Sequence, residues 1–225
     1  MRPVGFWTSE RSLSVLAGVV VASVFVIAPL TRPQGLGNVV LALAYLSILI
    51  SGIATVARTR VGAVAISIVA GLSALAWLVA YFAPGNSAEV GRKISGAIFC
   101  LLLSGVVFQR IFRSGHVTVH RISGAVAAYL LIGLVFAYLY DAIERLSPGS
   151  FYFATAGARD ASLNDPMVYF SFTTLTTVGY GDVTPQNPLT QSLANLESLI
   201  GQLFPTILIA RLVALELLPR PDPKE

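Results

Sequence analysis

The sequence NDPMVYFSFTTLTTVGYGDVTP occupies residues 164–185, and its centre is the pentapeptide TVGYG at residues 177–181. Gly179 and Gly181 stand at alternate positions, where they permit backbone angles that residues with a Cβ adopt only at a cost. If left- and right-handed angles alternate here, successive carbonyl oxygens point to one side of the strand. Carbonyl oxygens can replace the water around a cation, but one strand supplies too few of them. The segment therefore predicts a cation site that several copies of the chain form around an axis.

The residues before the pentapeptide predict a short helix that ends at this cation site. Asp165 or Asn164 can cap a helix whose first position is Pro166, a favoured starting residue. About ten helical residues follow, 167–176, which are too few to cross a bilayer. The C-terminal end of such a helix carries partial negative charge and would face a cation near the membrane centre. A glycine-rich turn between two membrane helices is the alternative.

The segment resembles the selectivity filter of potassium channels, in which four subunits each contribute a TVGYG strand. The resemblance implies a homotetramer that holds K+ ions, and no organic cofactor, through backbone carbonyl oxygens and the Thr177 hydroxyl. The implied K+ ligands are Thr177, Val178, Gly179 and Tyr180. The residues expected to support the filter are Gly181, Asp182, Tyr169, Phe170, Thr173 and Glu197. Tyr180 is expected to point away from the pore and to pack against Tyr169 and Phe170.

Glu197 lies within the predicted last membrane span, where a carboxyl group is costly and is a candidate functional residue. Its expected partners are the hydroxyl groups of Ser171, Thr173 or Thr174. In some potassium channels a pore-helix glutamate braces the aspartate after the filter. That position here is Thr173, so Glu197 is expected to replace the missing brace to Asp182. A place in a water-filled outer vestibule is the alternative.

The composition predicts that most of the chain lies in a lipid bilayer. The chain has 225 residues, of which 55% are hydrophobic and 12% charged, with a net charge of +4 and a mean hydropathy of +0.76. Such a chain has no room for a sizeable soluble domain. The single cysteine, Cys100, excludes a disulfide framework. We find no enzyme motif and no nucleic-acid-binding patch, so neither function is expected.

Six apolar segments and one re-entrant loop predict an all-α membrane protein. The expected spans are residues 13–30, 36–57, 61–83, 94–112, 122–143 and 189–218. The first segment is too long for the apolar core of a signal peptide, the alternative reading. Residues 146–165 are expected to form an outer turret. If the N-terminus is cytoplasmic, ten Lys and Arg residues lie inside and five outside. We therefore expect both termini in the cytoplasm and the filter at the outer face of a bacterial plasma (inner) membrane.

A pore between the last two of six spans is the plan of the voltage-gated superfamily. On this plan residues 1–115 form a four-helix bundle and residues 116–225 form the pore domain. A voltage sensor needs repeated arginines, because the field does about 2.3 kcal/mol of work per charge per 100 mV. Arg92 and Lys93 stand at the outer end of the fourth span, the next basic residue is Arg110 near its inner end, and residues 94–108 carry no charge. Conventional voltage gating is not expected. The bundle is predicted to be a scaffold, with a lipid or small-molecule site as the alternative.

The last span is expected to carry the gate. Gly201 is its only interior glycine and Pro205 its only interior proline, so the helix should bend nearby. By its register from the filter, Gly201 resembles the hinge glycine of two-span potassium channels, and a close-packing contact is the alternative. The residues expected on the cavity side are Gln202, Pro205 or Thr206, Ile209 and Val213. Ile209 and Val213 would form apolar rings that close the pore by dewetting.

Both histidines of the chain, His116 and His120, lie between the fourth and fifth spans. They are four residues apart and would share one face if this link is helical. A pH-responsive gate or a divalent metal site would follow from such a pair. Two polar residues at headgroup level are the favoured interpretation.

Residues 121–151 and 175–215 resemble the pore module of small bacterial ion channels, over roughly half of the chain. The sequence thus predicts a potassium-selective channel that conducts passively, with an opening stimulus that it does not reveal. A poorly selective cation channel is the alternative in the same class. From other classes, the alternatives are a non-conducting partner subunit and the ion-translocating part of a coupled uptake system.

Overall fold

The computed structural model describes residues 11–31, 36–56, 60–112, 118–154 and 165–216. Within these ranges, six helical segments are long and apolar enough to cross a membrane. They are α1 (Arg11–Val21) with its continuation η2 (Ala22–Ile27) and α2 (Ala28–Leu30), then α3 (Leu36–Val56), α4 (Arg60–Phe82), α5 (Asn86–Ile111), α6 (Val119–Leu146) and α9 (Pro188–Glu216). The chain is therefore a mostly helical, multi-pass membrane protein.

The fourth spanning helix begins earlier than the sequence predicts. The expected start is residue 94, whereas α5 begins at Asn86. That prediction is wrong because it treats charged residues as a boundary. Arg92 pairs with Glu89 of the same helix at 2.6 Å, and Lys93 pairs with aspartates of two other elements. Ion pairs at this spacing support a helix, and buried charges are tolerated when they are paired.

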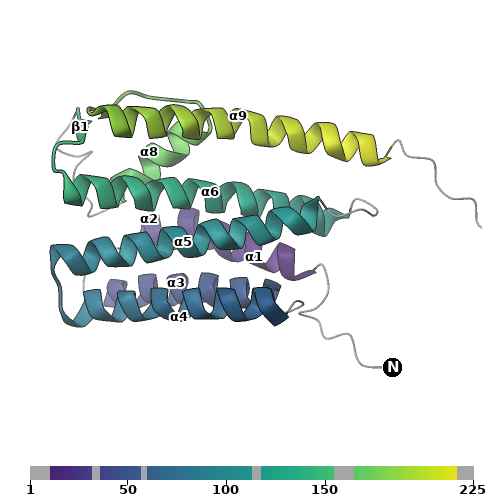
Figure 1. Cartoon of the computed structure of the whole chain (residues 1–225), viewed down its shortest axis with the longest axis horizontal. Helices are drawn as coiled ribbons and strands as arrows, with labels where there is room; N and C mark the ends of the chain where they lie inside the picture. The colour runs from purple at the N-terminus through teal and green to yellow at the C-terminus, as the bar shows by residue number, and fades with distance from the viewer. Residues whose placement is uncertain (1–10, 32–35, 57–59, 113–117, 155–164, 217–225) are drawn as a thin grey trace, which may run out of the picture.

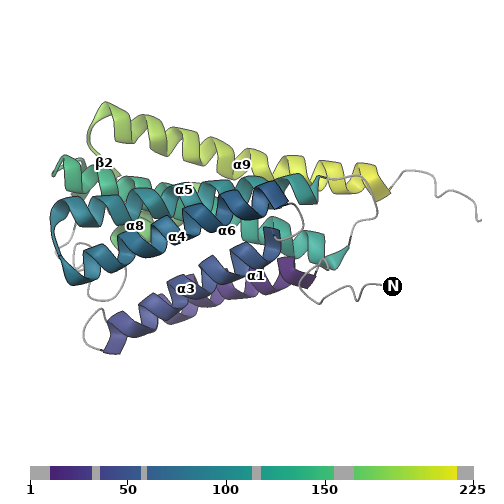
Figure 2. The same ribbon diagram turned by 60° about the horizontal axis from the view of Figure 1, so that its bottom comes forward.

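The helices are arranged so that a short helix, α8 (Pro166–Leu175), lies between α6 and α9 at one end of the bundle (Figure 1). Two short strands at the same end, β1 (Phe151–Phe153) and β2 (Val183–Pro185), pair antiparallel with Tyr152 opposite Thr184. The sequence does not predict this pairing. The start of α1 and the end of α9 both lie at the opposite end of the bundle, on different sides of it (Figure 1). Figure 2 shows α9 on the side of the bundle away from α1 and α3.

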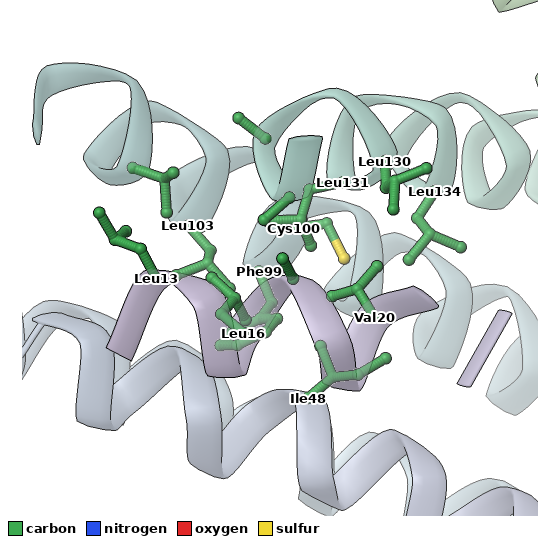
Figure 3. Close-up of a cluster of buried hydrophobic side chains, with 14 of the residues drawn as sticks. Leu13, Leu16, Val20, Ile48, Phe99, Cys100, Leu103, Leu130, Leu131 and Leu134 are labelled. Carbon is green, nitrogen blue, oxygen red and sulfur yellow. The ribbon is translucent and has the colours of Figure 1, made fainter. Parts of the chain in front are cut away.

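One apolar core joins the first four spanning helices to α6 (Figure 3). Leu16 and Val20 of α1, Phe99 and Leu103 of α5, and Leu131 of α6 are all fully buried. The core therefore crosses the predicted boundary between residues 1–115 and 116–225. Because α6 also contacts α8, the bundle and the candidate pore are packed against each other within one subunit.

The first spanning helix contains a π-helical segment, η2, that reaches α8. The N–H of Ala28 donates to the carbonyl of Ser23, five residues earlier, which is the π-helical pattern. The Phe25 ring in this segment lies 5.4 Å from the Phe172 ring of α8, in an edge-on arrangement. The first helix of the chain thus contacts the helix that precedes the predicted filter.

Helix α9 makes its closest approach to α8 at Gly201. A Cβ at this position would stand 1.8 Å from the carbonyl oxygen of Leu175, the last residue of α8. The same oxygen accepts a hydrogen bond of 3.0 Å from the Tyr129 hydroxyl of α6. Gly201 therefore serves as a close-packing position, the alternative to a hinge, and only a residue without a side chain fits there.

We expect Gly201→Ala to destabilise the protein, because the added methyl group forces α9 away from the α8 backbone. Overpacking of this kind costs about 1–3 kcal/mol. The measurement is the thermal unfolding of detergent-purified protein. The matched control is Gly71→Ala in α4, where a Cβ meets nothing within 4 Å and should be neutral or slightly stabilising. Equal unfolding temperatures for the two variants would contradict the close contact.

Candidate functional site

The short helix α8 begins as the sequence predicts. Asp165 is its N-cap, and its Oδ1 atom accepts a hydrogen bond of 3.1 Å from the N–H of Met167. Pro166 occupies the first helical position, where its missing N–H has no consequence. The helix has 10 residues, Pro166–Leu175, against the predicted 167–176. Its C-terminal end leads directly into residues 177–181, the filter segment.

The backbone of the filter segment has left-handed angles at every second residue. The φ angles are 61° at Thr177, 55° at Gly179 and 79° at Gly181. The intervening residues, Val178 and Tyr180, do not have positive φ. This is the alternation that the two glycines predict, and Thr177 adopts it despite its branched Cβ. Such strain persists only where the surrounding structure holds it.

The N–H groups at the start of the filter segment bond back to α8. The carbonyl of Thr173 accepts hydrogen bonds from Val178 at 2.9 Å and from Gly179 at 3.1 Å. The carbonyl of Thr174 accepts from Thr177 at 2.9 Å. Among the described residues, no donor is bonded to the carbonyl oxygens of 177–181. These oxygens, next to the C-terminal end of α8, are free to face a cation.

The aromatic support of the filter segment matches the prediction in part. The ring of Tyr180 is stacked on that of Tyr169, with centroids 6.3 Å apart. The Tyr169 hydroxyl donates to Oδ2 of Asp182 at 2.8 Å, whereas the carboxyl group of Glu197 contacts Tyr140 and Ser171, so the expectation that Glu197 braces Asp182 is wrong. Phe170 is instead buried in a separate cluster against Tyr140 and Phe151. Phe170 therefore packs α8 against α6 and β1, and a supporting role for the filter segment stays a prediction.

Glu197 is fully buried behind the filter segment and does not line a vestibule. The Tyr140 hydroxyl of α6 donates to its Oε2 at 2.7 Å, and Ser171 Oγ of α8 lies 2.5 Å from its Oε1. Ser171 Oγ is also 2.7 Å from the carbonyl of Gly133. Of the three predicted partners, the structure brings Ser171 to Glu197. Tyr140 was not predicted, because its contact with α9 is between residues 57 positions apart.

The hydrogen-bond count around Glu197 indicates which group supplies each proton. A carbonyl only accepts, so Ser171 uses its one proton for the hydrogen bond to the carbonyl of Gly133. The proton between Ser171 and Oε1 then comes from the carboxyl group of Glu197. A neutral carboxyl group also suits a fully buried position.

Glu197→Gln should therefore be tolerated, because an amide N–H can donate to Ser171 while the amide oxygen accepts from Tyr140. Glu197→Ala leaves a cavity and two unpaired hydroxyl groups, and we expect it to cost about 2–4 kcal/mol. Thermal unfolding of the purified variants measures both effects. A glutamine variant as unstable as the alanine variant would contradict this proton assignment.

The residues predicted to form the gate lie on α9 beyond Gly201. In the single subunit Gln202 and Thr206 are exposed, and Ile209 and Val213 are 61% and 53% exposed. Pro205 lies inside the helix, which continues to Glu216. Exposure in one subunit is compatible with a cavity-facing position, and the gating role stays a prediction.

The helix that carries His120 begins only at Val119. Thr118 is the N-cap of α6 and has extended angles, φ −112° and ψ 155°. The helical link on which a shared face of the two histidines depends is therefore interrupted at Thr118. Nδ1 of His120 instead lies 2.8 Å from the Ser14 hydroxyl oxygen of α1. His116 lies outside the described residues.

Sequence reasoning missed a cluster of charged residues at the start of α8, which we call the Lys93 cluster: Lys93, Asp141 and Asp165. Lys93 Nζ lies 2.6 Å from Asp165 Oδ2 and 3.0 Å from Asp141 Oδ2. Burial raises the pKa of Asp165, but the Lys93 ammonium and the Met167 N–H together lower it by more than burial raises it. The pKa of Asp165 therefore lies below its ordinary value of 3.8. The carboxylate is thus ionised at neutral pH.

The lowered pKa of Asp165 predicts how stability depends on pH. Its contribution should be fully present above about pH 4 and should be lost as the pH falls through the lowered pKa. Asp165→Asn keeps an N-cap but loses the charge. We expect this variant to unfold at a lower temperature than the wild type at pH 7, with the difference shrinking below about pH 4. A difference that is the same at pH 3 and pH 7 would contradict this expectation.

Residues 124–216 match a protein-family model described as "Ion channel". The match covers most of α6 and all of α8, the filter segment and α9. Together with the six apolar helices, it indicates an ion channel domain in a multi-pass membrane protein and points to transport instead of enzyme chemistry. No curated protein and no solved structure matches the chain.

Proposed function

We propose that the protein is a potassium-selective channel that conducts K+ passively through a homotetrameric pore. The observation that carries this proposal is the backbone of the filter segment. Its φ angles alternate in sign, its first N–H groups bond to α8, and its carbonyl oxygens have no described donor. Four such strands around an axis would surround a dehydrated K+ ion with oxygen atoms. K+ is the transported ion, and the mechanism requires no organic cofactor.

The exposed surface beside the filter segment supports assembly into an oligomer. Along α9, four apolar side chains on one face are about half exposed in the single subunit: Leu196, Leu199, Leu203 and Ile207. Val178 and Tyr180 of the filter segment are 53% and 71% exposed. A ring of subunits would cover this surface with identical contacts. The other exposed apolar side chains suit contact with the lipid bilayer.

The proposed orientation places both termini in the cytoplasm of a plasma membrane. The start of α1 and the end of α9 lie at the end of the bundle opposite α8 (Figure 1). Cytoplasmic termini would therefore put the filter segment near the outer face. Conventional voltage gating is not part of the proposal, because α5 carries no repeated arginines: residues 94–108 have no charged side chain.

The test is K+ flux through the purified protein in liposomes, with a K+ gradient and Na+ as the competing ion. We expect a reversal potential that follows the K+ gradient and a current that barium blocks. Gly179→Asp should abolish the flux, because it alters a left-handed position of the filter segment. The control is Gly149→Asp, the same substitution at a glycine with φ +89° in the turn after α6. This control should conduct as the wild type does.

Each alternative result of the flux experiment would indicate a different function. Equal permeability to Na+ and K+ would favour a poorly selective cation channel. No flux from correctly assembled protein, across a range of pH and voltage, would favour a non-conducting subunit of a larger transport assembly. A monomeric protein in detergent and in lipid would contradict the tetrameric pore.

A further inference from the structure

Lys93 is buried although it is basic. It lies in the second turn of α5, and it is 5% exposed. In the described part of the chain it is the only basic residue that is fully buried. Its neighbour Arg92 is 28% exposed in its side chain and pairs with Glu89 of the same helix. A buried ammonium group is costly unless it is paired. The partners of Lys93 therefore indicate its role in the structure.

The partners of Lys93 come from two elements of the ion channel domain. Its Nζ lies 3.0 Å from Asp141 of α6 and 2.6 Å from Asp165 at the start of α8. Arg145 lies 2.9 Å from Asp141, so two cations meet two carboxylates. The ring of Tyr138 lies 5.5 Å from Nζ and provides a further contact for the cation. Lys93 therefore joins α5, α6 and α8 at one point.

The two carboxylate oxygens of Asp165 have separate partners. Oδ1 accepts from the N–H of Met167 and caps α8, while Oδ2 accepts from Lys93. The position of the first turn of α8 is thus defined by a side chain of α5. Because Lys93 lies 72 residues before Asp165 in the sequence, this contact exists only in the folded chain.

A shift of α8 would reach the filter segment directly. The helix is 10 residues long and nearly rigid over about 15 Å. At its far end the carbonyl of Thr173 accepts the N–H groups of Val178 and Gly179. The route from Lys93 to the filter backbone therefore consists of one ion pair, one short helix and two hydrogen bonds.

We propose that Lys93 is a positioning residue for ion selectivity, and that α5 uses it to fix α8 and the filter segment. The inference rests on the proposed potassium conduction. It gives the first four spanning helices a function: they hold the filter in its selective geometry instead of only surrounding the pore. The ion pair of Lys93 with Asp165 carries this function, and that with Asp141 anchors the lysine to α6.

The experiment compares variants of the full chain in liposomes by the ratio of K+ to Na+ permeability from bi-ionic reversal potentials. Asp165→Asn is the main variant, since it keeps the cap of α8 and leaves Lys93 paired with Asp141. We expect the ratio to fall about tenfold, equivalent to about 1.4 kcal/mol. Lys93→Met should lower the ratio in the same direction. The double variant should be no worse than the more severe single variant, because both remove the same contact.

The control is Arg92→Met, which removes the adjacent positive charge and its ion pair with Glu89 but leaves the ion pair of Lys93 with Asp165 in place. It should keep the wild-type ratio. A wild-type ratio in Asp165→Asn, with conducting wild-type protein, would overturn the inference and leave the proposed channel intact. Absence of conduction in the wild type would overturn the proposed channel itself. If Lys93→Met does not fold, Asp165→Asn alone decides. A lower unfolding temperature with an unchanged ratio in Asp165→Asn would reduce the cluster to a structural role.

Discussion

The backbone of the filter segment depends on two neighbouring acceptors of α8, the carbonyl oxygens of Thr173 and Thr174. The N–H groups of Val178 and Gly179 bond to the first, and the N–H of Thr177 bonds to the second. In the proposed channel the carbonyl oxygens of this strand face the ions, so they cannot also hold the strand in place. The strand must be fixed from its N–H side, and here this means from the last turn of α8. The position of that turn therefore sets the geometry that a transported ion would meet.

The rest of the subunit contacts α8 at three points along its length. At its start, the ion pair of Asp165 joins it to α5. In its middle, Ser171 contacts Glu197 of α9 and Gly133 of α6. At its end, the Leu175 carbonyl accepts from Tyr129 and lies against Gly201. Each contact uses a polar backbone or side-chain group, and such a group is costly to leave without a partner where it is buried. A helix too short to be stable alone is thus held by its neighbours.

The sequence predicts the features that depend on neighbouring residues. The N-cap at Asp165, the length of α8 and the alternating angles at Gly179 and Gly181 follow from local rules, and the structure has all three. The stacking of Tyr180 on Tyr169 also follows, because both lie close to the filter segment in sequence. The six spans are predictable because apolar runs of about 20 residues are typical of membrane-spanning helices.

The features that the sequence does not predict depend on distant residues. The sequence predicts a span boundary at Lys93 because it does not reveal the partners of this charge. These partners, Asp141 and Asp165, lie 48 and 72 positions later. In the sequence Tyr140 has no feature that distinguishes it from the other aromatic residues of α6. Its hydrogen bond to Glu197 forms only when α9 packs against α6. The strands β1 and β2 are too short, at three residues each, to show a period in the sequence. Tertiary contact decides all three cases.

The π-helical segment η2 has a consequence for how the first helix could change over evolution. Each residue of an α-helix turns the chain by about 100°, so one inserted or deleted residue rotates everything beyond it by that angle. In η2 the wider turns set the angular offset between Leu16, which faces the core, and Phe25, which meets Phe172 of α8. Conversion of η2 to regular α-helix would turn Phe25 away from α8. The rotational phase of the first helix is thus set by a residue in α8, almost 150 positions further along the chain.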